Sequence, residues 1–257
     1  MSESLIITYE DGLQIIKFNR PKKLNSITLD VDHDLIAALD EAVRRDDVKI
    51  TVLTGEGQYF TAGNDFSAPS GEEDMEGTIR KSLAVFGNLI SVLIEHPKIL
   101  VAIVNGPSVG VGVTMLSHFD VIYAHEKATF HTPFSSLGLC AEGCSSYLFP
   151  RILGKSLAAK MLYFNYKMSA KEAADVGFVA QTYNQDTIGS IWQDLKAQAK
   201  LPIKSLMATK RLMRMPEIPK LKAINRSEIE VLTERFLSED FFNALMAMLA
   251  KRNKSKL

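Results

Sequence analysis

The stretch "ILVAIVNGPSVGVGVTMLSHF", Ile99 to Phe119, decides the fold of this chain. Its first part, ILVAIVNG, is a short run of aliphatic residues, which predicts a buried strand. Its last part, GVGVTMLSHF, predicts a helix that is opened by glycines. Such a turn presents free backbone N–H groups and the positive end of a helix dipole, which together stabilise an oxyanion. The stretch therefore predicts an α/β fold with an anion-stabilising turn.

A competing interpretation of the same stretch is a serine hydrolase. GPSVG, Gly106 to Gly110, matches the G-x-S-x-G motif between a strand and a helix, which would make Ser108 a nucleophile. That architecture places its histidine late in the chain, whereas the last histidine here is His131 and more than a hundred residues follow it. The pattern favours a turn residue at Ser108 over a nucleophile.

The segments before this stretch alternate between strand and helix patterns. LIITYEDGLQIIKFN predicts a β-hairpin that turns at Asp11–Gly12. Thr28 is a candidate N-cap for the amphipathic helix that follows, and ITVLTG predicts a further strand. The next loop, which contains YFTAGNDF, offers a second backbone donor, because Gly63 has no side chain to block a ligand.

Helical patterns dominate the chain from Glu142 onward. Residues 196–214 and 223–250 predict two long amphipathic helices separated by MPEIPK. We expect a core at residues 1–195 and a helical oligomerisation region at residues 196–257, since the second region carries a surplus of large apolar residues. These residues are Phe236, Leu237, Phe241, Phe242, Leu245, Met246, Met248 and Leu249.

Composition and charge exclude several classes of function. The 257 residues include 30 basic and 30 acidic side chains, and this zero net charge gives no general attraction to nucleic acid. No apolar run reaches the roughly 18 residues of a membrane helix, so we expect no membrane insertion. The five histidines lack paired metal-ligand spacing and the two cysteines do not form a scaffold, so we expect no metal site.

The sequence ends in Ser255, Lys256 and Leu257, and Ser-Lys-Leu at a C-terminus is a peroxisomal address. The first residues, MSESLIITYEDG, carry acids where a signal peptide would carry basic residues. We therefore expect the peroxisomal matrix as the location and the peroxisomal import receptor as a partner.

Four segments, in this order and spacing, resemble the crotonase, or enoyl-CoA hydratase/isomerase, superfamily. They are FNRPKKLNSI, QYFTAGNDF, VAIVNGPSVGVGVTML and FDVIYAHEKATFHTPF, and the resemblance extends over nearly the whole chain. It implies repeated ββα units coiled into a spiral, a helical C-terminal region, and homotrimers or dimers of trimers. It also implies an acyl-CoA thioester substrate and no cofactor beyond the coenzyme A of that substrate.

The resemblance also implies site residues. The thioester oxygen would lie between the backbone N–H groups of Asn64 and Val111. The expected substrate-binding residues are Lys22, Ala62, Gly63, Asn64, Asp65, Phe66, Gly110, Val111 and Phe134. Within this set we expect Asp65 to order its loop and Lys22 to meet the CoA phosphates.

The acidic positions of the family point to one kind of chemistry. The two hydratase carboxylates fall at Thr114 and Phe134, so both are absent, and of the two acids of the dienoyl-CoA isomerases only the later one remains, as Glu142. This pattern resembles the peroxisomal Δ3,Δ2-enoyl-CoA isomerases, in which one carboxylate moves a proton from C2 to C4. The alternatives left open are a hydratase or dienoyl-CoA isomerase, a non-catalytic acyl-CoA binder, and a Glu142 that merely opens a helix.

Overall fold

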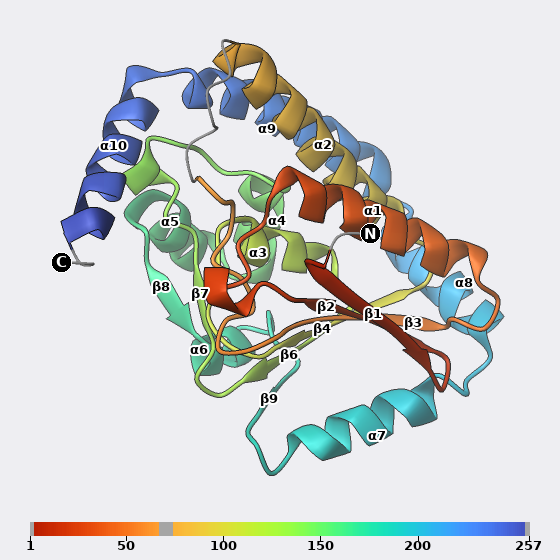
Figure 1. Cartoon of the computed structure of the whole chain (residues 1–257). Helices are drawn as coiled ribbons and strands as arrows, with labels where there is room; N and C mark the ends of the chain where they lie inside the picture. The colour runs from red at the N-terminus through yellow and green to blue at the C-terminus, as the bar shows by residue number, and fades with distance from the viewer. Residues whose placement is uncertain (1–2, 67–73, 255–257) are drawn as a thin grey trace.

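The computed structural model describes residues 3–66 and 74–254 and has a six-stranded sheet at its centre (Figure 1). The strand order is β1-β2-β3-β4-β6-β9, in which β1 is antiparallel to β2 and the other neighbours are parallel. The strands are β1 Leu5–Glu10, β2 Leu13–Phe18, β3 Ile50–Gly55, β4 Ile99–Val104, β6 Val121–His125 and β9 Gln181–Tyr183.

A second, three-stranded sheet has the order β5-β7-β8 and consists of β5 Ser108–Val109, β7 Thr129–His131 and β8 Lys167–Ser169. Consecutive strands divide between the two sheets, because β4 and β6 join the large sheet whereas β5 and β7, which follow them, join the small one. Isolated bridges between Ile27 and Asn64 and between Thr61 and Ser108 bring the preceding loops alongside the small sheet. This alternation is the predicted spiral of repeated units, and the fold class is confirmed.

The hairpin of β1 and β2 has the predicted turn. Asp11 and Gly12 both have positive φ, 49° and 83°, as a two-residue turn between twisted strands requires. The register pairs Leu5 with Phe18 and Glu10 with Leu13. Leu5, Ile16 and Phe18 belong to one hydrophobic cluster, whereas Leu13 belongs to a second cluster, so β2 is apolar on both faces.

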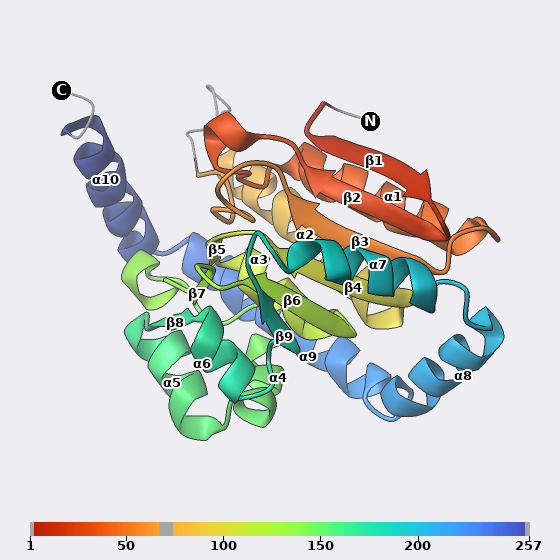
Figure 2. The ribbon, with the colours of Figure 1, turned by 90° about the horizontal axis from the view of Figure 1, so that it is seen from below.

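Helices cover both faces of the large sheet, as Figure 2 shows. On one face, α1 (Leu29–Arg44) and α2 (Met75–Glu95) share a hydrophobic cluster with Leu100, Ala102 and Val104 of β4. On the other face, α7 (Ile188–Gln198) packs Ile191 and Leu195 against the alternate residues of the same strand. A central parallel strand must be apolar on both faces, which is why ILVAIV reads as a continuous run.

Helix α2 is, by length and composition, long and apolar enough to cross a membrane. In this fold its apolar face packs against α1 and α9 (Ile218–Phe236), with Leu89, Ile90 and Leu93 fully buried. Asn225 of α9 also donates a hydrogen bond of 2.8 Å to the Gly87 carbonyl oxygen of α2. These contacts are those of a core helix.

The prediction of two long helices in the last third of the chain is wrong. The structure has α7, α8 (Ile203–Arg214), α9 and α10 (Glu239–Lys254) there, with breaks before Ile203 and after Phe236. Pro202 has extended backbone angles and no N–H, so it ends the first pattern. The remaining helical segments are η1 Pro21–Lys23, α3 Val111–Thr114, η2 Met115–His118, η3 Ser135–Leu137, α4 Ser145–Ile152, α5 Lys155–Phe164 and α6 Ala170–Asp175.

The break between α9 and α10 determines which residues of the predicted apolar surplus are buried within the chain. Phe236 and Phe241 lie with ring centroids 4.7 Å apart and are buried within the chain, and the partly buried Phe66 contacts them. Met246, by contrast, is 67% exposed. The surplus is therefore partly an internal cluster. The predicted boundary between residues 195 and 196 falls inside α7, and the division into a core and an oligomerisation region stays a prediction.

Asp120 fastens α8 to the large sheet. Its carboxylate accepts hydrogen bonds from the Leu100 N–H of β4 at 2.8 Å and from the Lys210 ammonium of α8 at 2.7 Å. Lys210 is buried and donates a further bond to the Lys98 carbonyl oxygen. Arg214, one turn after Lys210, donates to the His118 carbonyl oxygen. A buried ammonium that loses its anionic partner is strongly destabilising.

We expect Asp120→Asn to lower the free energy of unfolding by about 3 kcal/mol, because Lys210 keeps its burial and loses its counter-charge. Urea titration of the variant measures this loss. The matched control is Asp47→Asn, which breaks an exposed pair with Arg45 and should cost under about 1 kcal/mol. Equal losses in the two variants would contradict the fastening role of Asp120.

Candidate active site

One cavity of about 530 Å³ brings together every residue that the sequence singled out as a site residue. Its wall includes Lys22, Ala62, Gly63, Asn64, Asp65, Phe66, Gly110, Val111, Phe134 and Glu142. These residues come from four separate parts of the chain, so their assembly depends on the fold.

Sequence reasoning missed the part of the wall that comes from the last two helices. Leu232 and Phe236 of α9 and Met248 and Leu249 of α10 line the same cavity. The spacing of Leu232 and Phe236, one helical turn apart, indicated an apolar stripe without indicating what it faces. The break at Leu237 turns α10 back toward the cavity, and the predicted unbroken helix concealed this return.

The glycine loop, residues 62–66, lines the cavity and carries the Asn64 N–H. Ile27 donates to the Gly63 carbonyl oxygen at 2.9 Å, and Asp65 donates to the Ile27 carbonyl oxygen at 2.8 Å. Among the described residues, no acceptor is recorded for the Asn64 N–H that lies between these two bonds. Gly63 has φ +81°, and a Cβ there would approach the Val109 carbonyl oxygen to 2.9 Å. Glycine is therefore required to bring this loop against the next one.

Asp65 holds the loop in place. Its carboxylate accepts hydrogen bonds from the Ser26 hydroxyl at 2.9 Å and from the Arg20 guanidinium at 3.3 Å. These contacts agree with the loop-ordering role expected for Asp65. They also show how the residues next to Lys22 are tied to the glycine loop.

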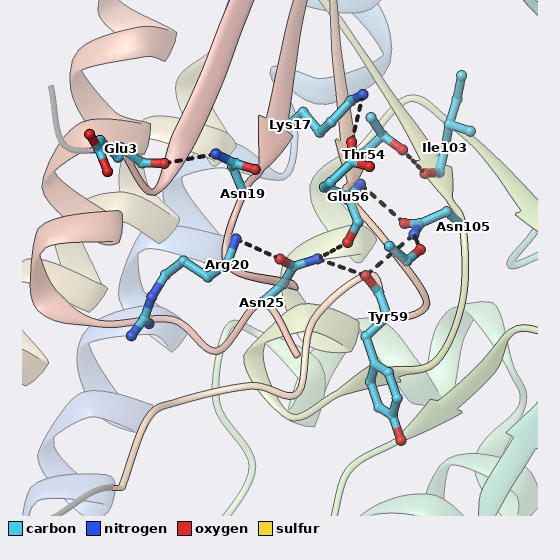
Figure 3. A network of polar contacts seen from close by, with 12 residues as sticks. Glu3, Lys17, Asn19, Arg20, Asn25, Thr54, Glu56, Tyr59, Ile103 and Asn105 are labelled. Carbon is cyan, nitrogen blue, oxygen red and sulfur yellow. Dashed lines mark hydrogen bonds and ion pairs between the residues drawn. The ribbon is translucent and has the colours of Figure 1, made fainter. Parts of the chain in front are cut away.

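Two asparagines fix the backbone behind the glycine loop (Figure 3). Asn25 donates to the carbonyl oxygens of Glu56 and Tyr59, at 2.9 and 2.8 Å. Asn105 accepts from the Gly55 N–H at 3.1 Å and donates to the Gly57 carbonyl oxygen at 2.8 Å. Asn25 itself has positive φ, which asparagine tolerates better than most residues. The segment that leads into the cavity is therefore pinned from both sides.

The turn after β5 supplies the second N–H. Gly110 has φ 57° and ψ −124°, a conformation open in practice to glycine alone, and its own N–H donates to the His131 carbonyl oxygen at 2.8 Å. The Val111 N–H comes next, and no acceptor for it is recorded in the described part of the chain. Helix α3 has four residues, so the N–H group itself contributes more here than the expected helix dipole.

The surroundings of Ser108 are not those of a catalytic nucleophile. Its hydroxyl is fully buried and has no hydrogen-bond partner among residues 3–66 and 74–254. A serine nucleophile needs a base within hydrogen-bond reach and an open side toward the substrate. The hydrolase interpretation is therefore not supported by this geometry.

Glu142 is a buried carboxyl group on the apolar side of the cavity. The side chain is 4% exposed, and the Thr114 hydroxyl donates to Oε1 at 3.4 Å. Burial, followed by the negative charge of Glu228, raises the pKa of Glu142 to about 8. Phe134, Leu137 and Leu139 line the same cavity, as expected for a site that holds a carboxyl group in its neutral form.

Asp32 is a second buried acid near Glu142 that the sequence did not reveal. It lies in the first turn of α1, and its Oδ1 has no hydrogen-bond partner in the described part of the chain. Burial raises the pKa of Asp32 to about 7, and its charge makes a smaller contribution to the raised pKa of Glu142. A first-turn aspartate looks like an exposed dipole partner in sequence, and only packing shows that this one is enclosed.

The interpretation of Glu142 as a helix-opening acid is wrong. Helix α4 begins at Ser145, and the carboxylate that meets its first N–H groups belongs to Glu228 of α9. Glu142 instead points to Thr114 and the cavity. The two residues between Glu142 and α4, Gly143 and Cys144, both have positive φ and turn the chain away from a regular helix start.

His118 supports the same turn from inside the protein. It is fully buried, and burial lowers the pKa of His118 to about 4, so the ring is neutral. Its Nε2 lies 2.9 Å from the Gly143 carbonyl oxygen, which can only accept, so Nε2 carries the proton. Within the described ranges, no three or more His, Cys, Asp or Glu side chains are grouped closely enough to hold a metal ion.

The fold and the cavity together define an α/β protein of two interleaved sheets, with two available backbone N–H groups and a buried carboxyl group on one cavity. A family model for enoyl-CoA hydratase/isomerase matches residues 8–255. The chain belongs to the enoyl-CoA hydratase/isomerase family, and its fold is the crotonase fold.

Individual relatives agree with this assignment. A Rattus norvegicus protein named enoyl-CoA delta isomerase 2 is 44% identical over 98% of this chain, which spans 65% of the length of that protein. A Mus musculus protein named enoyl-CoA delta isomerase 3, peroxisomal, is 38% identical over 100% of this chain and 81% of its own length. A solved enoyl-CoA hydratase/isomerase from Pseudoalteromonas atlantica T6c has a TM-score of 0.86 at 29% identity, covering 96% of this chain and 97% of that one.

The raised pKa of Glu142 predicts how stability depends on pH. Between pH 4.5 and about 8 the unfolded chain ionises this group while the folded chain keeps the proton, so its contribution to the free energy of unfolding falls as pH rises. Glu142→Gln removes this term, and the variant should become progressively more stable than the original protein across that window. The gain is about 1.4 kcal/mol for each pKa unit and should reach a few kcal/mol near pH 8.

Urea titrations at pH 5 and pH 8 measure this difference. Glu230→Gln is the matched control, because Glu230 lies exposed on α9 and should give the same small effect at both pH values. A Glu142→Gln protein that is no more stable at pH 8 than at pH 5, relative to the original protein, would show that the carboxyl group is ionised in the fold.

Proposed function

We propose that this protein is a Δ3,Δ2-enoyl-CoA isomerase, which shifts the double bond of a cis- or trans-3-enoyl-CoA to the trans-2 position. The single observation that carries the proposal is the buried carboxyl of Glu142 on the cavity wall, in a chain that has Thr114 and Phe134 at the two positions of the hydratase acids. The relatives named enoyl-CoA delta isomerase support the same activity.

The thioester carbonyl would be held by backbone donors. The N–H groups of Asn64 and Val111 come from two loops that meet at Gly63 and Val109, and the wall of the cavity includes both residues. Two fixed donors stabilise negative charge on the thioester oxygen without having to reorganise during the reaction. Lys22, at the same cavity, is the proposed partner of the CoA phosphates.

The reaction needs one proton carrier. The ionised Glu142 carboxylate removes a proton from C2 of the 3-enoyl-CoA, and the C–H electron pair moves into a dienolate whose charge rests on the thioester oxygen. The same carboxyl group then returns the proton at C4, the C2–C3 double bond forms, and the charge leaves the oxygen. The proton count balances and Glu142 is regenerated, so no cofactor, metal or redox partner takes part.

The environment of Glu142 suits both halves of this transfer. A pKa of about 8 makes the carboxylate a stronger base than an exposed glutamate, yet leaves about one tenth of it ionised at pH 7. The apolar wall of Phe134, Leu137 and Leu139 limits the access of water, which would otherwise add to the product double bond. Isomerisation is therefore favoured over hydration in this cavity.

The alternative activities require acidic residues that this chain does not have at the corresponding positions, or do not require Glu142. A hydratase of this family uses two carboxylates around one water, and a dienoyl-CoA isomerase places an acid where Phe134 lies here. A non-catalytic acyl-CoA binder has no use for a carboxyl group buried at the cost of stability. Glu142 together with Thr114 and Phe134 at the other two acid positions thus supports the monoenoyl isomerase among these alternatives.

Assembly and location are also proposals. The exposed apolar side chains of α8, Leu212 and Met213, support a threefold homo-oligomer of the kind implied by the family resemblance. The name of the peroxisomal mouse relative supports a peroxisomal location. The candidate signal, Ser255 to Leu257, lies outside the described residues.

Purified protein should convert 3-enoyl-CoA to 2-enoyl-CoA without forming 3-hydroxyacyl-CoA. Glu142→Gln should lower kcat by roughly 10²–10⁴, the usual range for the loss of a general acid–base group, and should leave KM nearly unchanged. In the original protein kcat/KM should rise with pH through about 8, because the base must be ionised. Product analysis by liquid chromatography measures all three quantities.

The control for the Glu142→Gln measurement is Cys140→Ser, a small change near Glu142 at a residue that does not line the cavity. It should keep kcat within about threefold of the original value. A folded Glu142→Gln protein with near-normal turnover would remove Glu142 from the mechanism, and accumulation of 3-hydroxyacyl-CoA would replace the isomerase with a hydratase.

Deletion of Leu257 should leave isomerase activity unchanged and move the protein from peroxisomes to the cytosol, because the import receptor reads the terminal Ser-Lys-Leu. Microscopy of a tagged full-length chain, expressed in cells that lack the untagged protein, measures the location. Peroxisomal fluorescence that persists after the deletion would contradict the assignment of the signal.

A further inference from the structure

Glu228 is a buried carboxyl group that the proposed reaction does not use. It lies in the middle of α9 and is 7% exposed. Its two oxygens accept hydrogen bonds from the Cys144 N–H at 2.6 Å and from the Ser146 N–H at 3.0 Å. The contact joins residues more than 80 positions apart, at the start of α4. A buried carboxylate is costly unless such donors satisfy it, so its position calls for a reason.

The turn that Glu228 holds is strained. Gly143 and Cys144 have φ 63° and 65°, and Cys144 is not a glycine, so its left-handed backbone is unfavourable unless the surroundings impose it. A Cβ on Gly143 would approach the Thr114 hydroxyl to 2.8 Å, which shows how closely the turn packs against the partner of Glu142. Glu228 supplies the bonds to the backbone on the C-terminal side of this turn, and His118 supplies the bond to the Gly143 carbonyl.

We propose that Glu228 is a positioning residue of the active site, whose carboxylate holds the left-handed turn that presents Glu142 to the cavity. The carboxylate reaches the chain two and four residues after Glu142, close enough to set the direction of the Glu142 side chain. This inference rests on the role of Glu142 proposed above.

The charge of Glu228 also affects the titration of Glu142, which a purely structural residue would not change. Burial raises the pKa of Glu228 as well, but hydrogen bonds from Ser146 and from the Cys144 N–H oppose this rise. Glu142 accepts one long bond from Thr114 among the described residues, so Glu228 ionises more readily than Glu142, and its charge favours the neutral form of Glu142. The other titratable or charged groups near the pair are Asp32 of α1, His118 of η2, Arg235 of α9, Cys140 and Cys144. None of these bonds to either carboxylate through its side chain in the described part of the chain.

Glu228→Gln tests the proposal, because it keeps the size of the side chain, removes the charge and leaves one acceptor for two N–H donors. Infrared difference spectra against Glu142→Gln identify the carboxyl band of Glu142 and follow its titration. We expect the midpoint to fall by about one pH unit or more in Glu228→Gln. The matched control is Glu230→Gln, an exposed change on the same helix, in which the midpoint should not move.

Turnover of 3-enoyl-CoA gives the second measurement. In Glu228→Gln, kcat should fall at least about tenfold at the optimal pH while KM changes less than about threefold, because the base is misplaced and the thioester contacts are intact. The rise of kcat/KM with pH should shift downward together with the infrared midpoint. Glu230→Gln should match the original protein in both respects.

A rescue experiment separates positioning from general destabilisation. Cys144→Gly removes the cost of the left-handed conformation, so the double variant Glu228→Gln/Cys144→Gly should recover several-fold of the lost kcat while its infrared midpoint stays low. If Glu228→Gln alone yields too little folded protein, the double variant is compared with Cys144→Gly instead, and the same downward shift is expected.

An unshifted Glu142 midpoint together with an unchanged kcat in the folded Glu228 variant would overturn the proposal. A failure of the proposed function has a different signature. In that case the original protein does not turn over 3-enoyl-CoA at any pH, yet the infrared titration of Glu142 still responds to Glu228→Gln.

Discussion

The backbone around the active-site cavity is organised about one buried carboxyl group, that of Glu142. Burial makes the ionised form unfavourable, and among the described residues one long hydrogen bond, from Thr114, offsets it. The surroundings must therefore be stable enough to hold this group, which explains the density of backbone constraints nearby. His118, Glu228 and the two left-handed residues Gly143 and Cys144 all fix the few residues that carry it.

Much of the core was predictable because its signals are local. The Asp11–Gly12 turn, the Thr28 cap and the apolar run of β4 each depend on residues adjacent in sequence, and the structure has all three. The cavity residues up to Glu142 were predictable because the sequence resembles the crotonase superfamily. Glu228 and Asp32 were not, because an acid in an amphipathic helix looks solvent-exposed in sequence and only packing from distant elements encloses it.

The last two helices show the limit of periodicity. Residues 223–250 have a nearly continuous apolar stripe, and the pattern alone favours one long helix. Helix α9 ends at Phe236 and α10 begins at Glu239, and the Ser238 hydroxyl between them accepts from the Phe241 N–H at the start of α10. Phe236 and Phe241 then meet Phe66 of the glycine loop, so an apparent surface surplus becomes part of the cavity wall.

The contact of Phe66 with Phe241 links the closure of the cavity to the docking of α10. The cavity wall combines Lys22 with Met248, more than two hundred residues further along the chain. The cavity is therefore complete only when α10 is docked against the rest of the fold. A chain in which α10 is not docked lacks Met248 and Leu249 on one wall of the cavity. Water then has access to a carboxyl group that the finished fold keeps dry.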